Sequence, residues 1–404
     1  MTESQNHLDV MSRHLSERHS SPVRLIEVEE LRPGRVIRVS VESGVAGLPA
    51  TMILKGPPVD ASPETHETRE THETQWRNEL AALQFLATFH PPIAPAVLSS
   101  DVEARVIALE DLGESPSLSD ILLWSDAGTA ATAMVDFARL IGRLHRESSG
   151  RVEEYYAIRQ GLGPVDRQRD RYFIRRRDVR GCLADVIGES MRHGLPAPGG
   201  RVSDEFEEIL AFLAEPGDCL AFTTGDPCPD NVVVREGVAQ LVDYEVAAFR
   251  HALLDAAYFV LPLPNCWCWR RFPEPVLDGM LAAYRAEISP VMPSVSEDAS
   301  FDAGLSRCSA AWLVFHLASR LPFVVESNRS FDLFNERERL ITMLRNFARL
   351  PATPAVTPYV GEWLGRLGER FEAMWPSEAA TVQLYPAFQR ERPVAPAFPA
   401  QPLS

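Results

Sequence analysis

Apolar and polar positions begin to alternate at residue 23, and the pattern predicts an antiparallel sheet near the start of the chain. The clearest run is residues 35–43, where isoleucine or valine occupies every second position between arginine, serine and glutamate, as in a strand with one buried face. A turn rich in Gly and Pro separates this run from residues 51–56, which also have the pattern of a strand. We therefore expect three antiparallel strands, after a polar and mobile tail over residues 1–22.

A helical pattern with one anomaly follows these strands. Trp76, Leu83 and Leu86 share one face at the spacing of a packed helix. Glu79 lies on the same face, where an acid needs either a partner or a route to solvent. The stretch before this helix, residues 59–75, contains Thr-His-Glu-Thr twice and is polar and of low complexity. This composition predicts a solvated, partly disordered loop rather than a metal site.

The rest of the chain is mostly helical by pattern. Residues 104–113 have the pattern of a strand that ends in acidic residues and Gly. The segments expected to form helices are 115–123, 131–147, 252–262, 302–321, 332–349 and 359–375. His145 lies at the end of one of them, where the helix dipole favours a cation, so we expect it to cap that helix. The last residues, 390–404, are rich in Pro and are expected to be extended.

Composition and charge narrow the function. The 404 residues carry a formal net charge of −16 and 45% are hydrophobic, as in an ordinary globular protein. An acidic molecule repels nucleic acid and anionic membranes, so we expect neither as a partner. The six cysteines have no metal-ligand or disulfide spacing, and the N-terminus lacks a signal-peptide pattern. A cytoplasmic location is expected.

One segment departs from the acidic balance. Residues 151–180 contain nine Arg and five acidic residues. Such a run is either a solvated helix face or a contact for a substrate or an acidic protein partner. Arg175, Arg176 and Arg177 are the candidates for that contact.

The chemistry centres on residues 223–234, Thr-Thr-Gly-Asp-Pro-Cys-Pro-Asp-Asn-Val-Val-Val. Asp226 and Asn231 lie in a turn bounded by Pro and Gly, and a short predicted hairpin then returns the chain to Asp243 beside Asn231. A carboxylate and a carboxamide, together with phosphate oxygens, are the ligands that Mg²⁺ prefers. Asp226 is then available to accept a proton from an attacking hydroxyl.

This pattern resembles the catalytic loop and the metal-binding Asp of the aminoglycoside phosphotransferase and choline kinase family. The carrying residues are Gly225-Asp226, Asn231, Val242-Asp243-Tyr244 and the later Leu254-Asp255. The resemblance implies a protein-kinase-like α+β fold with two lobes, an N-lobe antiparallel sheet with one helix and a larger, mostly helical C-lobe. The implied parts are a tail over 1–22, an N-lobe over 23–112, a C-lobe over 113–385 and a Pro-rich tail over 386–404.

The same resemblance implies further roles. Lys55 would hold the phosphates of ATP and pair with Glu79, which would explain the acid on the apolar helix face. The backbone of Glu110, Asp111 and Leu112 would hold adenine. Asp255 would support the catalytic loop from below, although on its own it is equally a helix N-cap.

Three features differ from the family pattern. The expected phosphate loop has a single Gly, and Arg32 or Arg35 could replace backbone donors by charge, although a plain hairpin turn is equally consistent. Thr224 stands where the family has His before Gly-Asp. Cys228 stands where a cationic or His side chain is usual, and it is otherwise a small packed residue of a tight loop.

We therefore predict an ATP- and Mg²⁺-dependent enzyme that moves the γ-phosphoryl group to a hydroxyl of a small molecule such as an antibiotic, amino sugar or amino alcohol. Two alternatives remain. The acceptor could be a peptide Ser or Thr, as in ribosomal peptide natural-product pathways, with the arginines near 175–177 holding the peptide. The chain could also be a degenerate kinase-like protein that binds a ligand or a partner without transferring phosphate.

Overall fold

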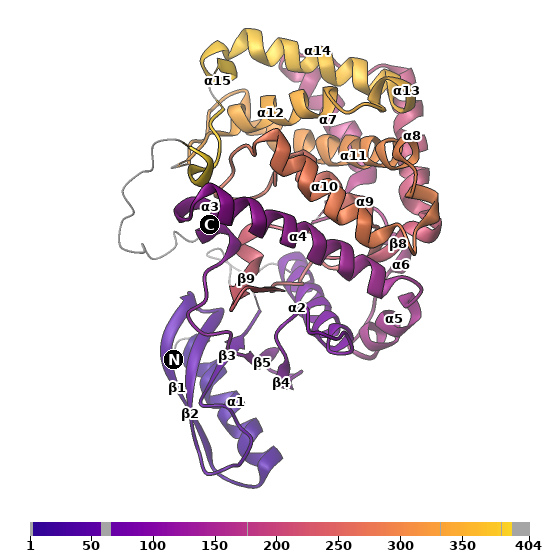
Figure 1. Ribbon diagram of the computed structural model, residues 1–404. Coiled ribbons are helices and arrows are strands. Elements are labelled where there is room, and N and C mark those ends of the chain that lie inside the picture. Colours follow the sequence, from indigo (N-terminus) through magenta and orange to yellow (C-terminus); the bar gives the residue numbers. More distant parts are fainter. Residues whose placement is uncertain (1–2, 58–65, 176, 332, 381, 390–404) are drawn as a thin grey trace.

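The structure is a computed structural model that describes residues 3–57, 66–175, 177–331, 333–380 and 382–389. Figure 1 shows a sheet with helix α1 (Glu3–His19) at one end of the molecule and a large group of helices at the other. None of the helices in the described ranges has the length and apolar character needed to cross a membrane.

Five antiparallel strands form the sheet, in the order β1-β2-β3-β5-β4. They are β1 (Val23–Arg32), β2 (Val36–Ser43), β3 (Thr51–Lys55), β4 (Val97–Asp101) and β5 (Val106–Glu110). The three expected N-terminal strands and the expected strand at β5 are confirmed. Strand β4, which the pattern did not indicate, completes the sheet.

Alternation along the strands divides the sheet into two faces. Ile37, Met52 and Leu54 are fully buried on one face, together with the N-terminal helix. Ile53, between the last two, packs instead into the core shared with α2 and the helical lobe. Because successive residues of a strand point to opposite sides, Lys55 lies on the face of Ile53.

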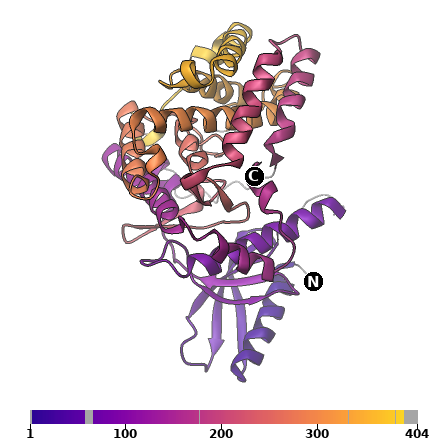
Figure 2. The ribbon, with the colours of Figure 1, turned by 90° about the vertical axis from the view of Figure 1, so that its right-hand side faces the viewer.

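The expectation of a mobile N-terminal tail was wrong. Residues Glu3–His19 form helix α1, which packs on β1, β4 and β5 and lies along the sheet in Figure 2. Leu8, Met11 and Leu15, spaced three and four residues apart, are buried against the sheet. The segment is polar on average, so its composition hid this narrow apolar stripe.

The expectation of a loop over 59–75 was also wrong from residue 66 onward. Helix α2 runs from His66 to Leu86, and the earlier part of that stretch lies outside the described residues. His72, Gln75 and Trp76 are buried on one face of α2. The stretch from His66 contains neither Pro nor Gly, and its helical spacing outweighed its polar composition.

Helices make up most of the second lobe, as expected. They are α3 (Leu118–Trp124), α4 (Ala127–Ser148), α5 (Val152–Gly161), α6 (Arg167–Asp170), α7 (Cys182–Arg192), α8 (Gly200–Ala214), α9 (Leu253–Val260), α10 (Glu274–Ile288), α11 (Asp298–Val324), α12 (Glu336–Ala348), α13 (Thr353–Val356), α14 (Pro358–Met374) and α15 (Pro376–Ala380). All six segments expected to be helical overlap one of these helices. Tyr385, Pro386 and Ala387 are buried, so the chain is still packed where the Pro-rich tail was expected to begin.

Three short antiparallel pairs carry the candidate site. Strand β8 (Leu220–Thr223) pairs with β11 (Ala248–His251), and β9 (Val232–Arg235) pairs with β10 (Val238–Leu241). A third pair, β6 (Phe173–Ile174) and β7 (Arg177–Asp178), lies in the Arg-rich segment. The loop with Asp226 and Asn231 runs from the end of β8 to the start of β9.

Candidate active site

Lys55 connects the sheet, helix α2 and the segment after β10. Its Nζ atom lies 2.8 Å from Glu79 Oε1 and 2.8 Å from Asp243 Oδ1. The expected pairing of Lys55 with Glu79 is therefore present, and Glu79 is buried with a partner rather than reaching solvent. The second carboxylate oxygen of Glu79 accepts a hydrogen bond from the backbone N–H of Tyr244, which fixes α2 against the Asp243 segment.

Burial and the neighbouring charges shift the pKa values of Lys55 and Glu79 in opposite directions. Burial alone would lower the pKa of Lys55, but the carboxylates of Asp243 and Glu79 outweigh it and raise the pKa above the ordinary value. Burial raises the pKa of Glu79, and Lys55 offsets only part of that rise. Lys55 is thus held as a cation where anionic groups converge.

Asp243 follows β10 with a positive φ of 74° and faces three cations. Besides Lys55, Arg32 Nη1 lies 3.6 Å and Arg35 Nη2 lies 3.9 Å from its carboxylate. Burial would raise the pKa of Asp243, but Lys55, followed by Arg35 and Arg32, holds it well below the ordinary value. Asp243 is therefore ionised at neutral pH.

The turn between β1 and β2 supplies the two arginines. Gly34 has φ 66°, a conformation that favours glycine, and the turn closes with a hydrogen bond of 3.0 Å from Arg35 N to Arg32 O. Arg35 also pairs with Glu245. The single-Gly turn is a tight hairpin, and it also brings two guanidinium groups to Asp243. We call Lys55, Glu79, Asp243, Arg32, Arg35 and Glu245 the Lys55 cluster.

The hairpin of β9 and β10 brings Asn231 and the Asp243 segment together. Val242 N donates to Asn231 O over 2.8 Å. The side-chain Nδ2 of Asn231 donates to the backbone oxygen of Asp226 over 3.2 Å, and Asn231 is buried. Since the amide nitrogen is used inside the loop, the carbonyl Oδ1 is the atom left to accept or to bind a cation.

Asp226 is surrounded by three donors. Tyr258 on α9 donates to Oδ1 over 2.9 Å, and Cys228 Sγ lies 3.4 Å from the same oxygen. Arg175 Nη2 lies 2.6 Å from Oδ2. Burial raises the pKa of Cys228 to about 12, so this thiol is neutral at neutral pH. We call Asp226, Arg175, Cys228 and Tyr258 the Asp226 cluster.

Asp255 lies beneath the loop that holds Asp226 and is fully buried. Its Oδ2 accepts from Thr224 N over 3.0 Å and from Thr224 Oγ1 over 3.3 Å. His145 Nε2 lies 3.3 Å from the same oxygen, and its Nδ1 lies 2.9 Å from the hydroxyl of Tyr284. His145 was expected to cap α4, but its buried side chain contacts Asp255 of α9 and Tyr284 of α10 instead. Thr224 ties the loop to α9.

The residues expected to form the hinge lie at the end of β5. Asp111 pairs with Arg38 over 3.1 Å and accepts from Gly113 N over 2.9 Å. Glu110 lies 3.1 Å from Arg235. Leu112 is buried. The two acidic side chains are thus used within the protein, and the segment connects the sheet to the second lobe.

The two described arginines of the expected acceptor contact have different partners. Arg175, with a positive φ of 52°, reaches Asp226. Arg177 pairs with Asp185 on α7 instead. Arg176 lies outside the described residues. Elsewhere in this segment, Arg159 is buried and donates to Asn78 over 2.7 Å, so the run is not simply a solvated face.

Sequence reasoning missed two neighbours of the catalytic loop. Tyr258 follows Asp255 by three residues on α9, so the two residues share one helix face, and this spacing could have indicated it. Asp230 precedes Asn231; burial, with a contribution from Asp226, raises its pKa to about 6. No sequence pattern separated it from an ordinary turn residue.

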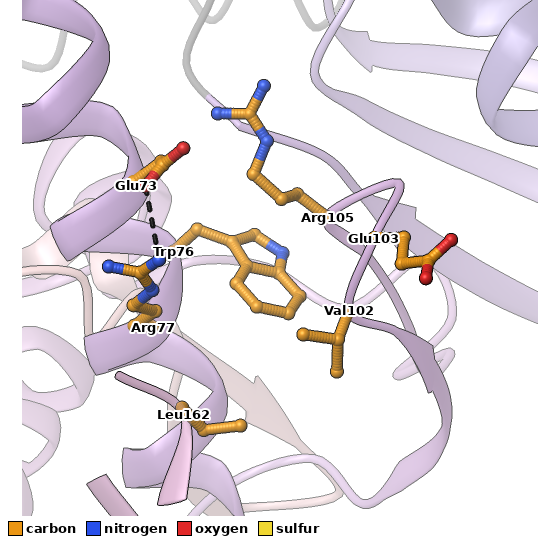
Figure 3. Close-up of a pocket in the computed structure, with 7 residues that line it drawn as sticks. All are labelled: Glu73, Trp76, Arg77, Val102, Glu103, Arg105 and Leu162. Atoms are coloured by element: carbon orange, nitrogen blue, oxygen red, sulfur yellow. Dashed lines mark hydrogen bonds and ion pairs between the residues drawn. The ribbon is translucent and has the colours of Figure 1, made fainter. Parts of the chain in front are cut away.

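A hollow of about 320 Å³ lies away from these clusters. It is lined by α2, by the loop between β4 and β5, and by Leu162 (Figure 3). On the α2 side of the hollow, Arg77 pairs with Glu73 over 3.1 Å. Neither the Lys55 cluster nor the Asp226 cluster contributes a lining residue.

Comparison with known families identifies the class of the protein. The model of the phosphotransferase enzyme family matches residues 44–297, more than half of the chain. The chain belongs to this family. The resemblance to aminoglycoside phosphotransferases and choline kinases is confirmed, as is the protein-kinase-like fold with its antiparallel sheet and helical lobe. The expectation of a kinase, a phosphotransferase with an alcohol group as acceptor, agrees with this membership.

Solved structures with a similar fold share little sequence with the chain. Choline kinase LicA from Streptococcus pneumoniae is 13% identical, with 84% of this chain and 98% of that chain covered and a TM-score of 0.42. A choline/ethanolamine kinase family protein from Mesorhizobium loti is 16% identical. The match covers 91% of this chain and 100% of that chain, with a TM-score of 0.42. A thermostable mutant of an aminoglycoside phosphotransferase, in a ternary complex with ADP and hygromycin B, is 12% identical. The match covers 92% of this chain and 99% of that chain, with a TM-score of 0.34. No curated protein matches the sequence. Similarities this low do not define a substrate.

Proposed function

We propose that this chain is an ATP- and Mg²⁺-dependent O-phosphotransferase that acts on a hydroxyl of a small molecule. The observation that carries the proposal is the convergence of Lys55, Asp243 and Asn231 beside a loop that holds Asp226. Family membership supports phosphoryl transfer, and ATP with a divalent metal is the usual reagent of such enzymes. The cytoplasmic location expected from the sequence belongs to the same proposal, supported by six free cysteines.

The residues present suit Mg²⁺ bound to nucleotide phosphates. Asp243 is ionised, and the amide of Asn231 is oriented by its own hydrogen bond so that its oxygen is left as an acceptor. Hard oxygen ligands of this kind, one or two from the protein, are what Mg²⁺ takes when it is shared with phosphates. Bound there, the ion would neutralise charge on the phosphates.

The cations of the Lys55 cluster would hold the nucleotide. Lys55 is buried and charged, and Arg32 and Arg35 reach the same carboxylate. Phosphate oxygens can take the place of carboxylate oxygens as partners for these donors. The backbone of residues 110–112, at the end of β5, is proposed to hold the base.

Asp226 is proposed as the group that accepts the proton of the acceptor hydroxyl. Tyr258 and Cys228 approach Oδ1, whereas Oδ2 is approached by Arg175. Tyr258 therefore orients the carboxylate from the protein side. Arg175 comes from the short β6–β7 hairpin, so an acceptor that reaches Oδ2 has to share or displace this guanidinium. We propose Arg175 as an acceptor-site residue.

A peptide acceptor remains a hypothesis that no contact of the described residues favours. Arg175 is engaged with Asp226 and Arg177 with Asp185, so neither guanidinium lacks an acidic partner. The acidic balance of the chain suits a cationic small molecule, but charge steers association without identifying a ligand.

The experiment is a phosphoryl-transfer screen with ATP and Mg²⁺ against aminoglycosides, other antibiotics, amino sugars and amino alcohols. Mass spectrometry would record a gain of one phosphate on the acceptor. Binding is measured separately, because ATP with Mg²⁺ must raise the apparent melting temperature if it binds the native state. No thermal shift at millimolar nucleotide would indicate the degenerate, non-catalytic alternative. Phosphate gain on a Ser or Thr peptide alone would indicate the peptide kinase.

A further inference from the structure

Two thiols and a carboxylate meet next to the catalytic loop. Cys228 Sγ, Cys266 Sγ and a carboxylate oxygen of Asp230 all lie within 4.8 Å of one another. Cys228 and Asp230 come from the loop that holds Asp226, and Cys266 comes from the segment after α9. The three side chains are close enough for one ion to contact them all.

One carboxylate oxygen of Asp230 has an unsatisfied hydrogen-bonding capacity. Asp230 Oδ1 is buried and has no hydrogen-bond partner among the described residues. A buried polar atom without a partner is rare in folded proteins and calls for an explanation, such as an ion. The neighbouring atoms are two thiol sulfurs, which are weak donors, so they do not replace an ordinary hydrogen bond.

The ligand types select the kind of ion. Thiolates favour soft or borderline metals such as Zn²⁺, whereas Mg²⁺ and Ca²⁺ prefer oxygen. The two thiol sulfurs lie within 4.8 Å of each other, and both cysteines are buried. Two Cys and one Asp would provide three of the four ligands of a tetrahedral Zn²⁺ site and leave the fourth position for water.

We propose that Cys228, Cys266 and Asp230 form a binding site for Zn²⁺, distinct from the Mg²⁺ ligands of the proposed function. A bound ion would displace both thiol protons, because cysteine binds metal as the thiolate. Cys228 would then have no proton to share with Asp226 Oδ1, 3.4 Å away, or with Tyr258, whose hydroxyl is 2.8 Å from the sulfur. Zn²⁺ occupancy would therefore change the surroundings of the proposed base.

The other cysteines offer a matched control. Cys308 on α11 is buried like Cys266, but its sulfur faces His251 at 3.9 Å, and it is not part of the cluster. Cys308→Ser therefore imposes the same change of a buried thiol to a hydroxyl without removing a proposed ligand.

The test uses the reduced, nucleotide-free, full-length protein and Co²⁺ as a spectroscopic probe, followed by competition with Zn²⁺. We expect a sulfur-to-cobalt charge-transfer absorption at one Co²⁺ per chain, release of about two protons per ion, and loss of the band when Zn²⁺ is added. Cys266→Ser and Asp230→Asn should weaken binding by about 100-fold or more, since even outer-shell changes cost 10–100-fold. Cys308→Ser should bind like the wild type.

The wild-type measurement decides the proposal even if a variant does not fold. Absence of the charge-transfer band in the folded wild type would overturn it, as would a band that persists unchanged in Cys266→Ser. Two of the six thiols missing under non-reducing conditions, without a cobalt band after reduction, would show a disulfide pair instead and would also overturn it. Neither ATP nor an acceptor is involved, so this result is independent of the proposed transferase activity.

Discussion

The Lys55 cluster and the Asp226 cluster lie in the same site but are built differently. The Lys55 cluster has three cations and three acids, and its central ion pair joins a strand end to a long helix. The Asp226 cluster has one acid, one cation and two neutral donors. Its acid lies in a loop, and its cation lies in a hairpin with strands of two residues.

The two clusters differ in what positions their central ion pair: regular secondary structure in the Lys55 cluster, and loops in the Asp226 cluster. Lys55 and Glu79 are set by the periods of a strand and a helix, so their pairing needs no special loop. Arg175 depends on a residue with positive φ in a very short hairpin. We infer that regular structure fixes the proposed nucleotide side, and that the proposed acceptor side, built from loops, is where this chain would acquire its own substrate.

The largest effect is expected at Asp226. Asp226→Asn removes the proposed proton acceptor and keeps the shape, so kcat should fall by roughly 10²–10⁴-fold, the usual contribution of a general base. The ATP-induced thermal shift should be retained. Asp243→Ala is the matched variant of the Lys55 cluster and should lose the Mg²⁺-dependent shift as well. Wild-type turnover in Asp226→Asn would contradict the assignment.

The next effect concerns the stability of the Lys55 cluster. Lys55→Met leaves Glu79 and Asp243 buried without their shared cation, so the free energy of unfolding should fall by about 3–5 kcal/mol. Adding Glu79→Gln should recover part of that loss, because one of the unpaired charges is then gone. Urea unfolding of the two single variants and the double variant measures the coupling. Strictly additive effects would mean that the pair does not interact.

The strand pair β8–β11, which leads into the loop of the Asp226 cluster, should respond to acid. His251 on β11 is buried, and burial lowers its pKa from 6.5 to about 3. Below pH 6.5, His251 binds a proton in the unfolded chain but stays neutral in the native protein. The free energy of unfolding therefore falls as the pH falls toward 3. This group should contribute a loss of up to about 1.4 kcal/mol per pH unit.

His251→Gln cannot bind that proton and should flatten the pH dependence over the same range. The check is urea unfolding at several pH values between 7 and 4, where the two proteins should converge as the pH falls. Parallel curves for wild type and variant would mean that His251 is not held neutral.

The smallest effect separates the two described arginines of the expected acceptor contact. Arg177→Ala breaks a largely solvent-facing pair with Asp185, so stability should change by less than about 0.5 kcal/mol and turnover should stay near the wild-type value. Arg175→Ala should change the KM for the acceptor while the ATP-induced shift is unchanged. Equal effects of the two substitutions on acceptor KM would remove the distinction drawn between them.

Much of the fold could be predicted because its signals are periodic. Alternation identified β2, and a short strand pattern identified β3. Helical spacing identified α2 from Trp76 onward, and helical patterns identified six helices of the second lobe. Composition misled at two places. The polar averages of residues 3–19 and 66–75 concealed stripes such as Leu8, Met11 and Leu15, which contact the sheet only after folding. The mean polarity of a segment cannot reveal an apolar stripe that contains only one residue in each helical turn.

The sequence by itself determined the family, the class of reaction and the order of the proposed site residues, because these depend on residue types at fixed short spacings. Only the tertiary structure decided which long-range partners they have. Arg175 meets Asp226 from 51 residues away, and His145 meets Asp255 from 110 residues away. Cys266, in the segment after α9, lies beside Cys228 of the loop that holds Asp226. These contacts depend on how separate elements pack, and local spacing carries no information about that packing.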